Sequence, residues 1–290
     1  MLQQKADGWG NHSSTRPTAE EKEQNSNSGR AASELTMSGG YFYSVLVTGA
    51  NRGIGLELVR QLLGQARPPR WVFATCRDPA KAQELKKLGS KHPGLVILRL
   101  ESTDEASIEA SAKEAETHLA GSGLNLLINN AGIMLPSTLE LVTQEEMLNV
   151  YHVNVVGPML VTKAFLPLLK TAAQRSSRRG LSCGRAAVIN VSTIGSSIGN
   201  PPSMDTFPVI SYRCSKTALN MLTRCQALEY KDDSILCAAL HPGWVKTELG
   251  TDKAELTVEE SVSGILEVLS SLSEEQNGRV VDWEGKPVLW

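Results

Sequence analysis

The sequence predicts an α/β protein: a single doubly wound, Rossmann-like domain with a parallel sheet of about seven strands. Two features lead to this fold class. Short, continuous apolar runs are typical of strands buried on both faces, and they alternate with longer segments whose apolar residues recur every three to four positions. Regular alternation of strand and helix indicates parallel strands with helices on both faces, because each parallel pair needs a crossover connection.

The expected elements follow one another from residue 44 onward. We expect strands at the seven apolar runs, which are 44–48, 71–76, 95–100, 124–129, 186–192, 235–241 and 278–283. Helical periodicity is clear at 53–64 and 212–230. Because the sequence shows no internal repeat and no linker in this part, residues 41–290 are expected to form one domain.

Residues 1–40 differ from the rest in composition. They contain no Val, Ile or Phe, so they cannot bury enough apolar area to offset the entropy lost on ordering, and we expect a disordered leader. The segment lacks the apolar stretch of a secretory signal, and its acidic residues argue against a mitochondrial presequence. The alternative interpretation is that translation starts at Met37, because the folded pattern begins soon after it.

The overall composition argues against several classes of protein. In 290 residues, 29 basic and 31 acidic side chains give a net charge of −2, which argues against a general nucleic-acid or anionic-membrane binder. No apolar run approaches the roughly 18–20 residues that span a bilayer. The five cysteines do not have the spacing of a metal site, so we expect reduced thiols and no bound metal. Reduced thiols are typical of intracellular proteins, so we expect a cytoplasmic protein.

A glycine-rich turn joins the first strand to the first helix. It reads Thr-Gly-Ala-Asn-Arg-Gly-Ile-Gly over residues 48–55. Gly49 permits a tight turn, Gly53 lets the backbone approach a pyrophosphate, and the helix presents its free N–H groups and positive dipole end. Because the turn stands between a buried strand and an amphipathic helix, it predicts a dinucleotide site.

The end of the second strand indicates which dinucleotide is bound. An enzyme that uses NAD usually places an acidic residue there to hold the ribose 2′-hydroxyl. This chain has Arg77 instead, and Arg52 stands inside the glycine turn. Two guanidinium groups favour a 2′-phosphate, and so NADP(H) over NAD(H). Asp78 is expected to cap a helix that begins at Pro79.

Tyr212 and Lys216 stand four residues apart at the start of a predicted helix, so both project from one face. An ammonium beside a phenol favours the phenolate, which predicts a Tyr212 pKa below the usual value of about 10. Ser192 ends the fifth strand, where its hydroxyl can donate to a substrate carbonyl. Asn154 lies in a helical segment, where a buried amide commonly pairs with the local backbone.

Two loops and one histidine are open to two interpretations. The segment 172–185 carries four arginines and is interpreted as a solvated loop, with a phosphate-binding patch as the alternative. The segment 196–210 carries three prolines and is interpreted as a loop or lid at the edge of the sheet where α/β proteins bind ligands. His241, at a strand end before proline, is interpreted as structural, with a proton-transfer role as the alternative.

Residues 44–290 resemble the short-chain dehydrogenase/reductase family, in particular the carbonyl-reductase-like branch called sniffer or C-factor-like. The resemblance rests on motifs in the family's order: T-G-x3-G-x-G at 48–55, N-N-A-G at 129–132, Asn154, Ser192, Y-x3-K at 212–216 and P-G-x3-T at 242–247. The chain departs from the family at Glu101, where an aspartate is common, and in the long interval between Ser192 and Tyr212, which indicates a partly covered pocket.

The resemblance implies an NADPH-dependent reductase of small-molecule carbonyl compounds. Tyr212 would be the general acid, Lys216 would lower its pKa and, with Asn154, relay protons, and Ser192 would polarise the carbonyl. The residues expected to hold the cofactor are Gly49, Asn51, Arg52, Gly53, Ile54, Gly55, Arg77, Glu101, Ser102, Asn130, Ala131, Gly132, Tyr212, Lys216, Pro242, Gly243, Val245 and Thr247. The resemblance also implies a homodimer or homotetramer, as many relatives form, with a monomer as the alternative. The alternative function is an NADP(H)-binding signalling or scaffold protein of the same fold with little turnover.

Overall fold

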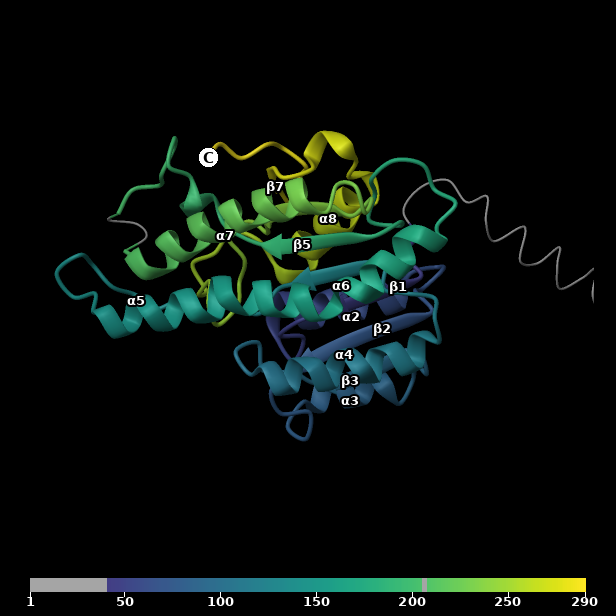
Figure 1. The fold of residues 1–290 in the computed structure, drawn as a ribbon. Coiled ribbons are helices and arrows are strands. Elements are labelled where there is room, and N and C mark those ends of the chain that lie inside the picture. Colours follow the sequence, from purple (N-terminus) through teal and green to yellow (C-terminus); the bar gives the residue numbers. More distant parts are fainter. Residues whose placement is uncertain (1–40, 205–207) are drawn as a thin grey trace, which may run out of the picture. The chain divides into compact units, whose positions relative to one another are not determined.

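The computed structural model describes residues 41–204 and 208–290 (Figure 1), so the predictions made for residues 1–40 lie outside the described residues. The described residues contain one seven-stranded parallel sheet in the order β3-β2-β1-β4-β5-β6-β7. Its strands are β1 (Ser44–Val47), β2 (Trp71–Cys76), β3 (Leu95–Arg99), β4 (Leu126–Asn129), β5 (Ala187–Val191), β6 (Leu236–His241) and β7 (Val280–Asp282). Each falls within a predicted run, and the doubly wound α/β class is confirmed.

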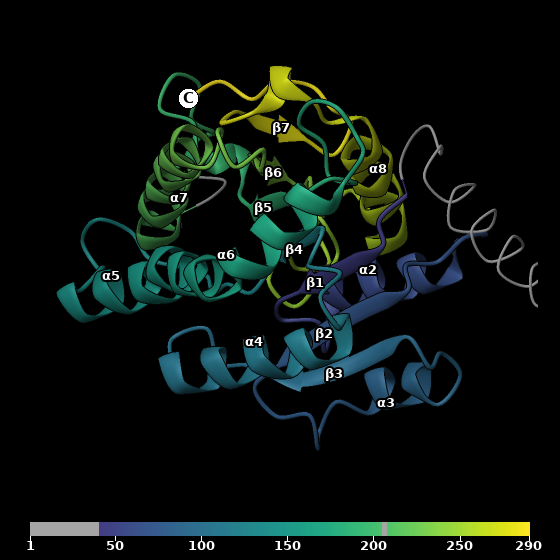
Figure 2. The ribbon, with the colours of Figure 1, turned by 45° about the vertical axis from the view of Figure 1, so that its right-hand side comes forward.

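Helices cover both faces of the sheet (Figure 2). One face carries α2 (Gly53–Gly64), α3 (Gln83–Gly89) and α8 (Val258–Ser271), and the other carries α4 (Glu105–Leu119), α6 (Gly157–Arg175) and α7 (Ile210–Glu229). The other helical elements of the described residues are α5 (Gln144–Tyr151), the π-helix η1 (His152–Val156), and the short 3-10 turns η2 (Ile194–Ser196) and η3 (Glu274–Gln276). The helix predicted at 53–64 is confirmed with those bounds, and the one predicted at 212–230 begins two residues earlier.

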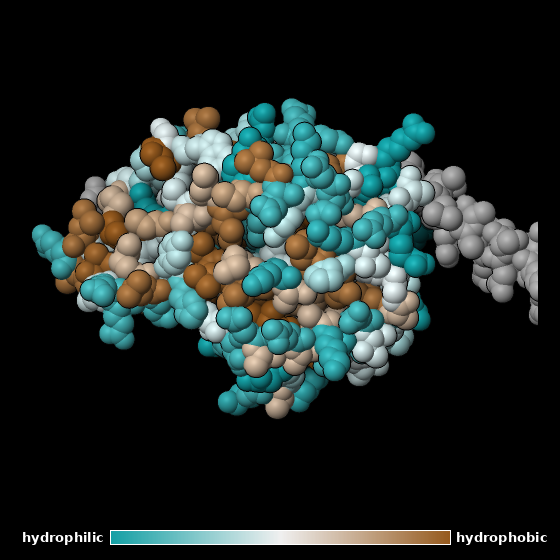
Figure 3. Space-filling view, in the orientation of Figure 1, coloured by the Kyte–Doolittle hydropathy of each residue, from teal (hydrophilic) through white to brown (hydrophobic). Residues whose placement is uncertain are grey.

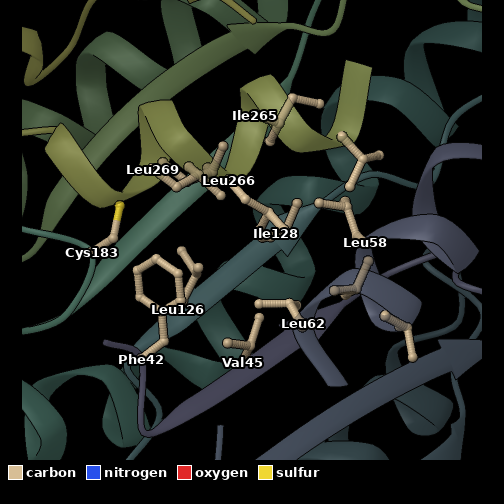
Figure 4. Packing of buried hydrophobic residues seen from close by; sticks show 14 of the residues in the cluster. Phe42, Val45, Leu58, Leu62, Leu126, Ile128, Cys183, Ile265, Leu266 and Leu269 are labelled. Atoms are coloured by element: carbon tan, nitrogen blue, oxygen red, sulfur yellow. The ribbon is translucent and has the colours of Figure 1, made fainter. Parts of the chain in front are cut away.

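Two apolar clusters lie on opposite faces of the sheet. Along β1, Val45 and Val47 contribute to one cluster and Leu46 to the other, because successive side chains of a strand point to opposite faces. Figure 4 shows the first cluster, in which Leu58 of α2 and Ile265 of α8 pack over β1 and β4. A strand that is buried on both faces needs apolar residues at every position, which explains the continuous apolar runs.

The segment α5–η1–α6 is one uninterrupted helical run. Among the described residues, Gln144–Arg175 is the one helix long and apolar enough to cross a membrane by length and composition. Half of its most apolar window is buried inside the protein, where Phe165 and Leu169 pack in the second cluster. This burial is what a core helix shows, and the expected absence of a membrane partner stays a prediction.

The arginine-containing loop precedes β5, at the edge of the sheet where the strands begin. The helix α6 continues to Arg175, and the loop then buries Leu181 and Cys183 in the first cluster. Arg185 donates hydrogen bonds to the carbonyl oxygens of Ala173, at 3.2 Å, and Gly180, at 3.2 Å. The loop is therefore partly packed rather than wholly solvated, and it stands apart from the opposite edge, where the strands end.

Apolar side chains also gather on the surface around α5, at the left of the space-filling view (Figure 3). Leu139 and Leu141, before the helix, and Leu148 and Tyr151, within it, are exposed. Such a patch is compatible with contact between subunits. The expectation of a homodimer or homotetramer stays a prediction.

Candidate active site

A cavity of about 1360 Å³ lies at the edge of the sheet where the strands end. Segments that follow each of the strands β1 to β6 line it, at the edge where open α/β sheets bind ligands. With two exceptions, the residues predicted for the site all line this cavity. The exceptions are Gly55 and Asn154, which lie behind its wall.

The glycine turn has the conformation that its residues predict. Gly49 and Gly53 have positive φ angles of +63° and +54°, a region that favours glycine. Gly55 is needed for a close approach, because a Cβ atom there would lie 2.5 Å from the Gly49 oxygen and 2.6 Å from Asn130 Nδ2. Asn130 Nδ2 also donates to the Thr48 carbonyl at 2.9 Å. The N-N-A-G segment thus holds the glycine turn in place.

The helix that follows this turn begins without a side-chain cap. Arg52 occupies the N-cap position of α2 and makes no capping hydrogen bond, whereas Asp104 caps α4 and Thr257 caps α8. The first N–H groups of a helix carry partial positive charge and need an acceptor. The uncapped start of α2, beside Gly49 and Gly53, fits a pyrophosphate.

Both arginines predicted to hold a 2′-phosphate line the cavity and pair with carboxylates. Arg52 is paired with Glu248, on the segment after β6. Arg77 Nε lies 3.7 Å from Glu101 Oε2. The arginine side chains are 61% and 79% exposed, and exposed ion pairs contribute about 0–1 kcal/mol. An added phosphate can therefore compete for either guanidinium group.

Asp78 does not cap a helix. Its Oδ1 accepts the Ala80 N–H at 3.0 Å and closes a turn, and α3 begins only at Gln83. The prediction of a helix from Pro79 was wrong, because the carboxylate satisfies the backbone N–H two residues on and stabilises a local turn instead.

Tyr212 and Lys216 are buried side by side on α7. Lys216 Nζ lies 5.7 Å from the centroid of the Tyr212 ring and donates to the Val191 carbonyl at 2.7 Å. Burial lowers the pKa of Lys216 to about 8. Burial also raises the pKa of Tyr212, against the opposing effect of a hydrogen bond with Thr193. The predicted lowering of the Tyr212 pKa was wrong, because the cost of desolvating a phenolate dominates.

The two hydroxyl residues that follow β5 point to different partners. Ser192 Oγ donates to Asn220 Oδ1 at 2.6 Å, on the side of α7. The Thr193 hydroxyl is hydrogen-bonded to Tyr212 and accepts the Gly195 N–H at 3.1 Å. Both residues line the cavity, but the hydroxyl against the phenol is that of Thr193. Thr193 was not among the predicted site residues, although the alternation of side chains at a strand end implies that only one of two neighbours faces a given partner.

Asn154 supports the site from behind. It is fully buried within the π-helix η1, and its amide accepts the Ile133 N–H at 2.9 Å and donates to the Ile133 carbonyl at 2.8 Å. Its Nδ2 also donates to Ser215 Oγ at 3.0 Å. Gly132 lies between this amide and Lys216, since a Cβ there would be 3.1 Å from Asn154 Oδ1 and 3.5 Å from Lys216 Nζ. The amide pairs with backbone, but with that of Ile133, 21 residues earlier in the chain, so the expectation of a local backbone partner was wrong.

The segment between Ser192 and Tyr212 forms part of the cavity wall. Ile194, Gly195 and Pro202 line the cavity, and Arg213 of α7 donates to the carbonyl oxygens of Pro202, at 2.8 Å, and Ser203, at 3.0 Å. The long interval in the sequence thus supplies a wall of the cavity that is tied to α7. Residues 205–207 lie outside the described part.

Further lining residues were not predicted. They are mostly apolar and include Ile133, Met134, Val153, Ile194, Trp244 and Leu249. His241 also lines the cavity, and burial lowers its pKa to about 4 despite the opposing charge of Asp282. The imidazole is therefore neutral near pH 7, which favours the structural interpretation. In 41–204 and 208–290, no cluster of His, Cys, Asp or Glu has the arrangement of a metal site.

Known proteins with similar sequences and structures identify the family of this chain. The family model described as short chain dehydrogenase matches residues 43–257. The crystal structure of an NADPH-bound carbonyl reductase from chicken fatty liver is similar, with 55% sequence identity, a TM-score of 0.82, and coverage of 86% of this chain and 99% of that one. The carbonyl reductase Sniffer of D. melanogaster is 39% identical, with a TM-score of 0.82 and coverage of 86% and 100%.

The sequence relatives agree with these structures. The short chain dehydrogenase gsfK of Penicillium aethiopicum is 34% identical over 267 residues, which cover 85% of this chain and 99% of that protein. The family resemblance inferred from the motifs, including its sniffer-like branch, is thereby confirmed. The chain belongs to the short-chain dehydrogenase family.

Proposed function

We propose that the protein is an NADP(H)-dependent oxidoreductase that reduces the carbonyl group of a small molecule to an alcohol. One observation carries the proposal. Tyr212, which is hydrogen-bonded to Thr193 and lies next to Lys216, lines the same cavity as the glycine turn. A proton donor and a dinucleotide-binding turn in one cavity are what carbonyl reduction by hydride transfer requires.

The residues present fit a dinucleotide that carries a 2′-phosphate. The uncapped start of α2 would hold the pyrophosphate, and Arg52 and Arg77 would hold the 2′-phosphate. Asn130–Gly132 and Glu101 with Ser102 would line the adenosine side, and Pro242 with Thr247 the nicotinamide side. The similar chicken carbonyl reductase is NADPH-bound, which supports the assignment.

The bound cofactor would supply a hydride to the carbonyl carbon. Tyr212 would donate its phenolic proton to the carbonyl oxygen, so that the C=O bond becomes C–H and O–H bonds and the phenolate is left to be reprotonated. Because burial raises its pKa, the phenol stays protonated near pH 7, as an acid must. Lys216 would stabilise the phenolate that forms, and Asn154 would hold Gly132 and the neighbouring backbone beside it.

Thr193, and not Ser192 as the resemblance implies, would provide the hydroxyl that acts with Tyr212 on the substrate carbonyl. Its hydrogen bond lowers the Tyr212 pKa against the effect of burial, which stabilises the phenolate left after proton transfer. The Ser192 proton is already donated to Asn220. The structure therefore favours Thr193 for polarising the carbonyl and Ser192 for support.

Turnover with a panel of aldehydes, diketones and quinones tests the proposal, with NADPH consumption as the measurement. Tyr212→Phe should lower kcat by about 10³-fold, while NADPH binding stays within about twofold of the parent. Thr193→Val should lower kcat by about 10²-fold and Ser192→Ala by much less. An active Tyr212→Phe enzyme would refute the acid, and equal losses at residues 192 and 193 would refute the choice of Thr193.

The alternative, a cofactor-binding signalling or scaffold protein, is distinguished by the same panel. Such a protein needs the glycine turn and the arginines but has no use for the buried Tyr212–Thr193 pair. NADPH binding without consumption of any carbonyl compound would favour the scaffold. Under the enzyme proposal the protein works in the cytoplasm on a small molecule.

A further inference from the structure

We propose that Asn220 is a positioning residue that holds Thr193 against Tyr212. The inference rests on the proposed function, because it concerns the hydroxyl assigned to work beside the acid. Asn220 is not part of the cavity lining, and it is 2% exposed. Its effect would pass through the turn that carries Thr193.

Three hydrogen bonds connect Asn220 to both sides of Thr193. Ser192 Oγ donates to Asn220 Oδ1 at 2.6 Å, and Asn220 Nδ2 donates to Ser196 Oγ at 2.8 Å. Ser196 Oγ then donates to the Thr193 carbonyl at 2.5 Å. The circuit encloses the turn from residue 192 to residue 196, and each of its three side chains is at most 2% exposed.

One helix carries the phenol and the amide. Tyr212, Lys216 and Asn220 are spaced by four residues on α7, so they lie along one face of the helix. Thr217, on the next position after Lys216, adds a second attachment, since its hydroxyl donates to the Ser196 carbonyl at 2.9 Å. A rigid helix thus sets the distance between Tyr212 and the turn that bears its hydroxyl partner.

The amide of Asn220 suits this task because both of its ends are used. Its oxygen accepts from the residue before Thr193, and its nitrogen donates to the residue three positions after it. Substitution by an apolar side chain would leave Ser192 without its acceptor in a buried place and loosen the turn. A misplacement of about 1 Å is enough to lower a rate strongly where geometry sets the reaction.

The test compares Asn220→Leu with Asn220→Asp. Asn220→Leu should lower kcat about tenfold while KM for NADPH and the NADPH dissociation constant stay within about twofold. Asn220→Asp keeps the oxygen that accepts from Ser192 but loses the nitrogen that donates to Ser196, so its kcat should lie between that of Asn220→Leu and that of the parent. Thr223→Val is the matched control, because Thr223 is equally buried on α7 and accepts from Asn190 of β5 at 2.8 Å without touching the turn.

A double-mutant cycle with Thr193→Val decides whether Asn220 acts through Thr193. In the Thr193→Val background, Asn220→Leu should lower kcat by less than about twofold further. Full additivity, an unchanged kcat in Asn220→Leu, or an equal loss in Thr223→Val would each overturn the inference. If Asn220→Leu does not fold, Ser196→Ala carries the test, with a smaller kcat loss expected that also vanishes in the Thr193→Val background.

Failure of the inference is distinguishable from failure of the proposed function. A parent enzyme that consumes NADPH and is impaired by Thr193→Val, but not by Asn220→Leu, keeps the proposed function and removes the role of Asn220. A parent without turnover, or a fully active Thr193→Val enzyme, removes the proposed function or its Thr193 step, and the positioning role with it.

Discussion

The guanidinium group of Arg77 lies against the carboxylate of Glu101, with 3.7 Å between Nε and Oε2. The two residues follow neighbouring strands, since β2 and β3 pair in parallel with Cys76 opposite Arg99. Arg77, which is proposed to select NADP(H) over NAD(H), therefore already has a carboxylate beside it when no phosphate is bound. This relationship yields opposite predictions for the two residues.

Arg77→Asp should weaken NADPH binding at least about 20-fold and change NADH binding by less than about threefold. A guanidinium group can bind a phosphate bidentately, whereas a carboxylate repels the 2′-phosphate and can accept from the 2′-hydroxyl of NADH. Titration of the cofactor-free protein with each nucleotide measures both dissociation constants. Equal loss for both nucleotides would contradict the assignment of Arg77 to the 2′-phosphate.

Glu101→Gln should tighten NADPH binding by about two- to fivefold at low ionic strength. The change removes the carboxylate that competes for Arg77, and such exposed pairs are worth about 0–1 kcal/mol. NADH binding should stay the same, and the gain should shrink in 0.5 M salt, with a Debye length of only about 4 Å. Glu84→Gln is the control, because Glu84 pairs with Lys87 on α3. Weaker NADPH binding would show that the contact of Glu101 with the nucleotide outweighs its competition for Arg77.

Without cofactor, Lys216→Met should have a larger free energy of unfolding than the parent at pH 7. This difference should become smaller at alkaline pH. The folded pKa of Lys216 is about 8 and its ordinary value is 10.5. Between these values the unfolded chain binds the extra proton, so this group makes the parent more stable as pH rises, by about 3 kcal/mol at most. Denaturant unfolding of both proteins from pH 7 to 10.5 measures the difference in their free energies of unfolding. Lys231→Met, at an exposed lysine, is the control.

His241→Gln should flatten the dependence of stability on pH between 4 and 6.5. The folded pKa of His241 is about 4, below its ordinary value of 6.5, so the unfolded chain takes up the proton first as pH falls. The parent should lose up to about 3 kcal/mol across this range from this group, and His241→Gln should not. His152→Gln, at an exposed histidine, should leave the slope intact. An unchanged slope in His241→Gln would show that the imidazole is not buried in its neutral form.

The elements of the sheet were predictable because their determinants are local or periodic. A strand such as β5 is apolar at most positions because both faces are buried, and the turn after β1 needs glycine where φ is positive. The gathering of the site residues was predictable for the same reason, since parallel strands end at one edge.

The errors concern quantities that depend on three-dimensional surroundings. The spacing of Tyr212 and Lys216 indicates a shared helix face but says nothing of the desolvation that raises the Tyr212 pKa. Ser192 and Thr193 are adjacent hydroxyl residues, and which of them meets Tyr212 depends on the twist of the chain after β5 and on an acceptor, Asn220, that is distant in sequence.

The loop before β5 offers a place to attach the protein to a surface or a reporter. It lies where the strands begin, whereas the proposed chemistry lies where they end. Ser177 and Arg179 are exposed, while Leu181 and Cys183, a few positions later, belong to the core and should be left intact. A tether inserted beside Ser177 would leave the mouth of the cavity open to small molecules. Immobilised and free protein should therefore convert substrate at the same rate.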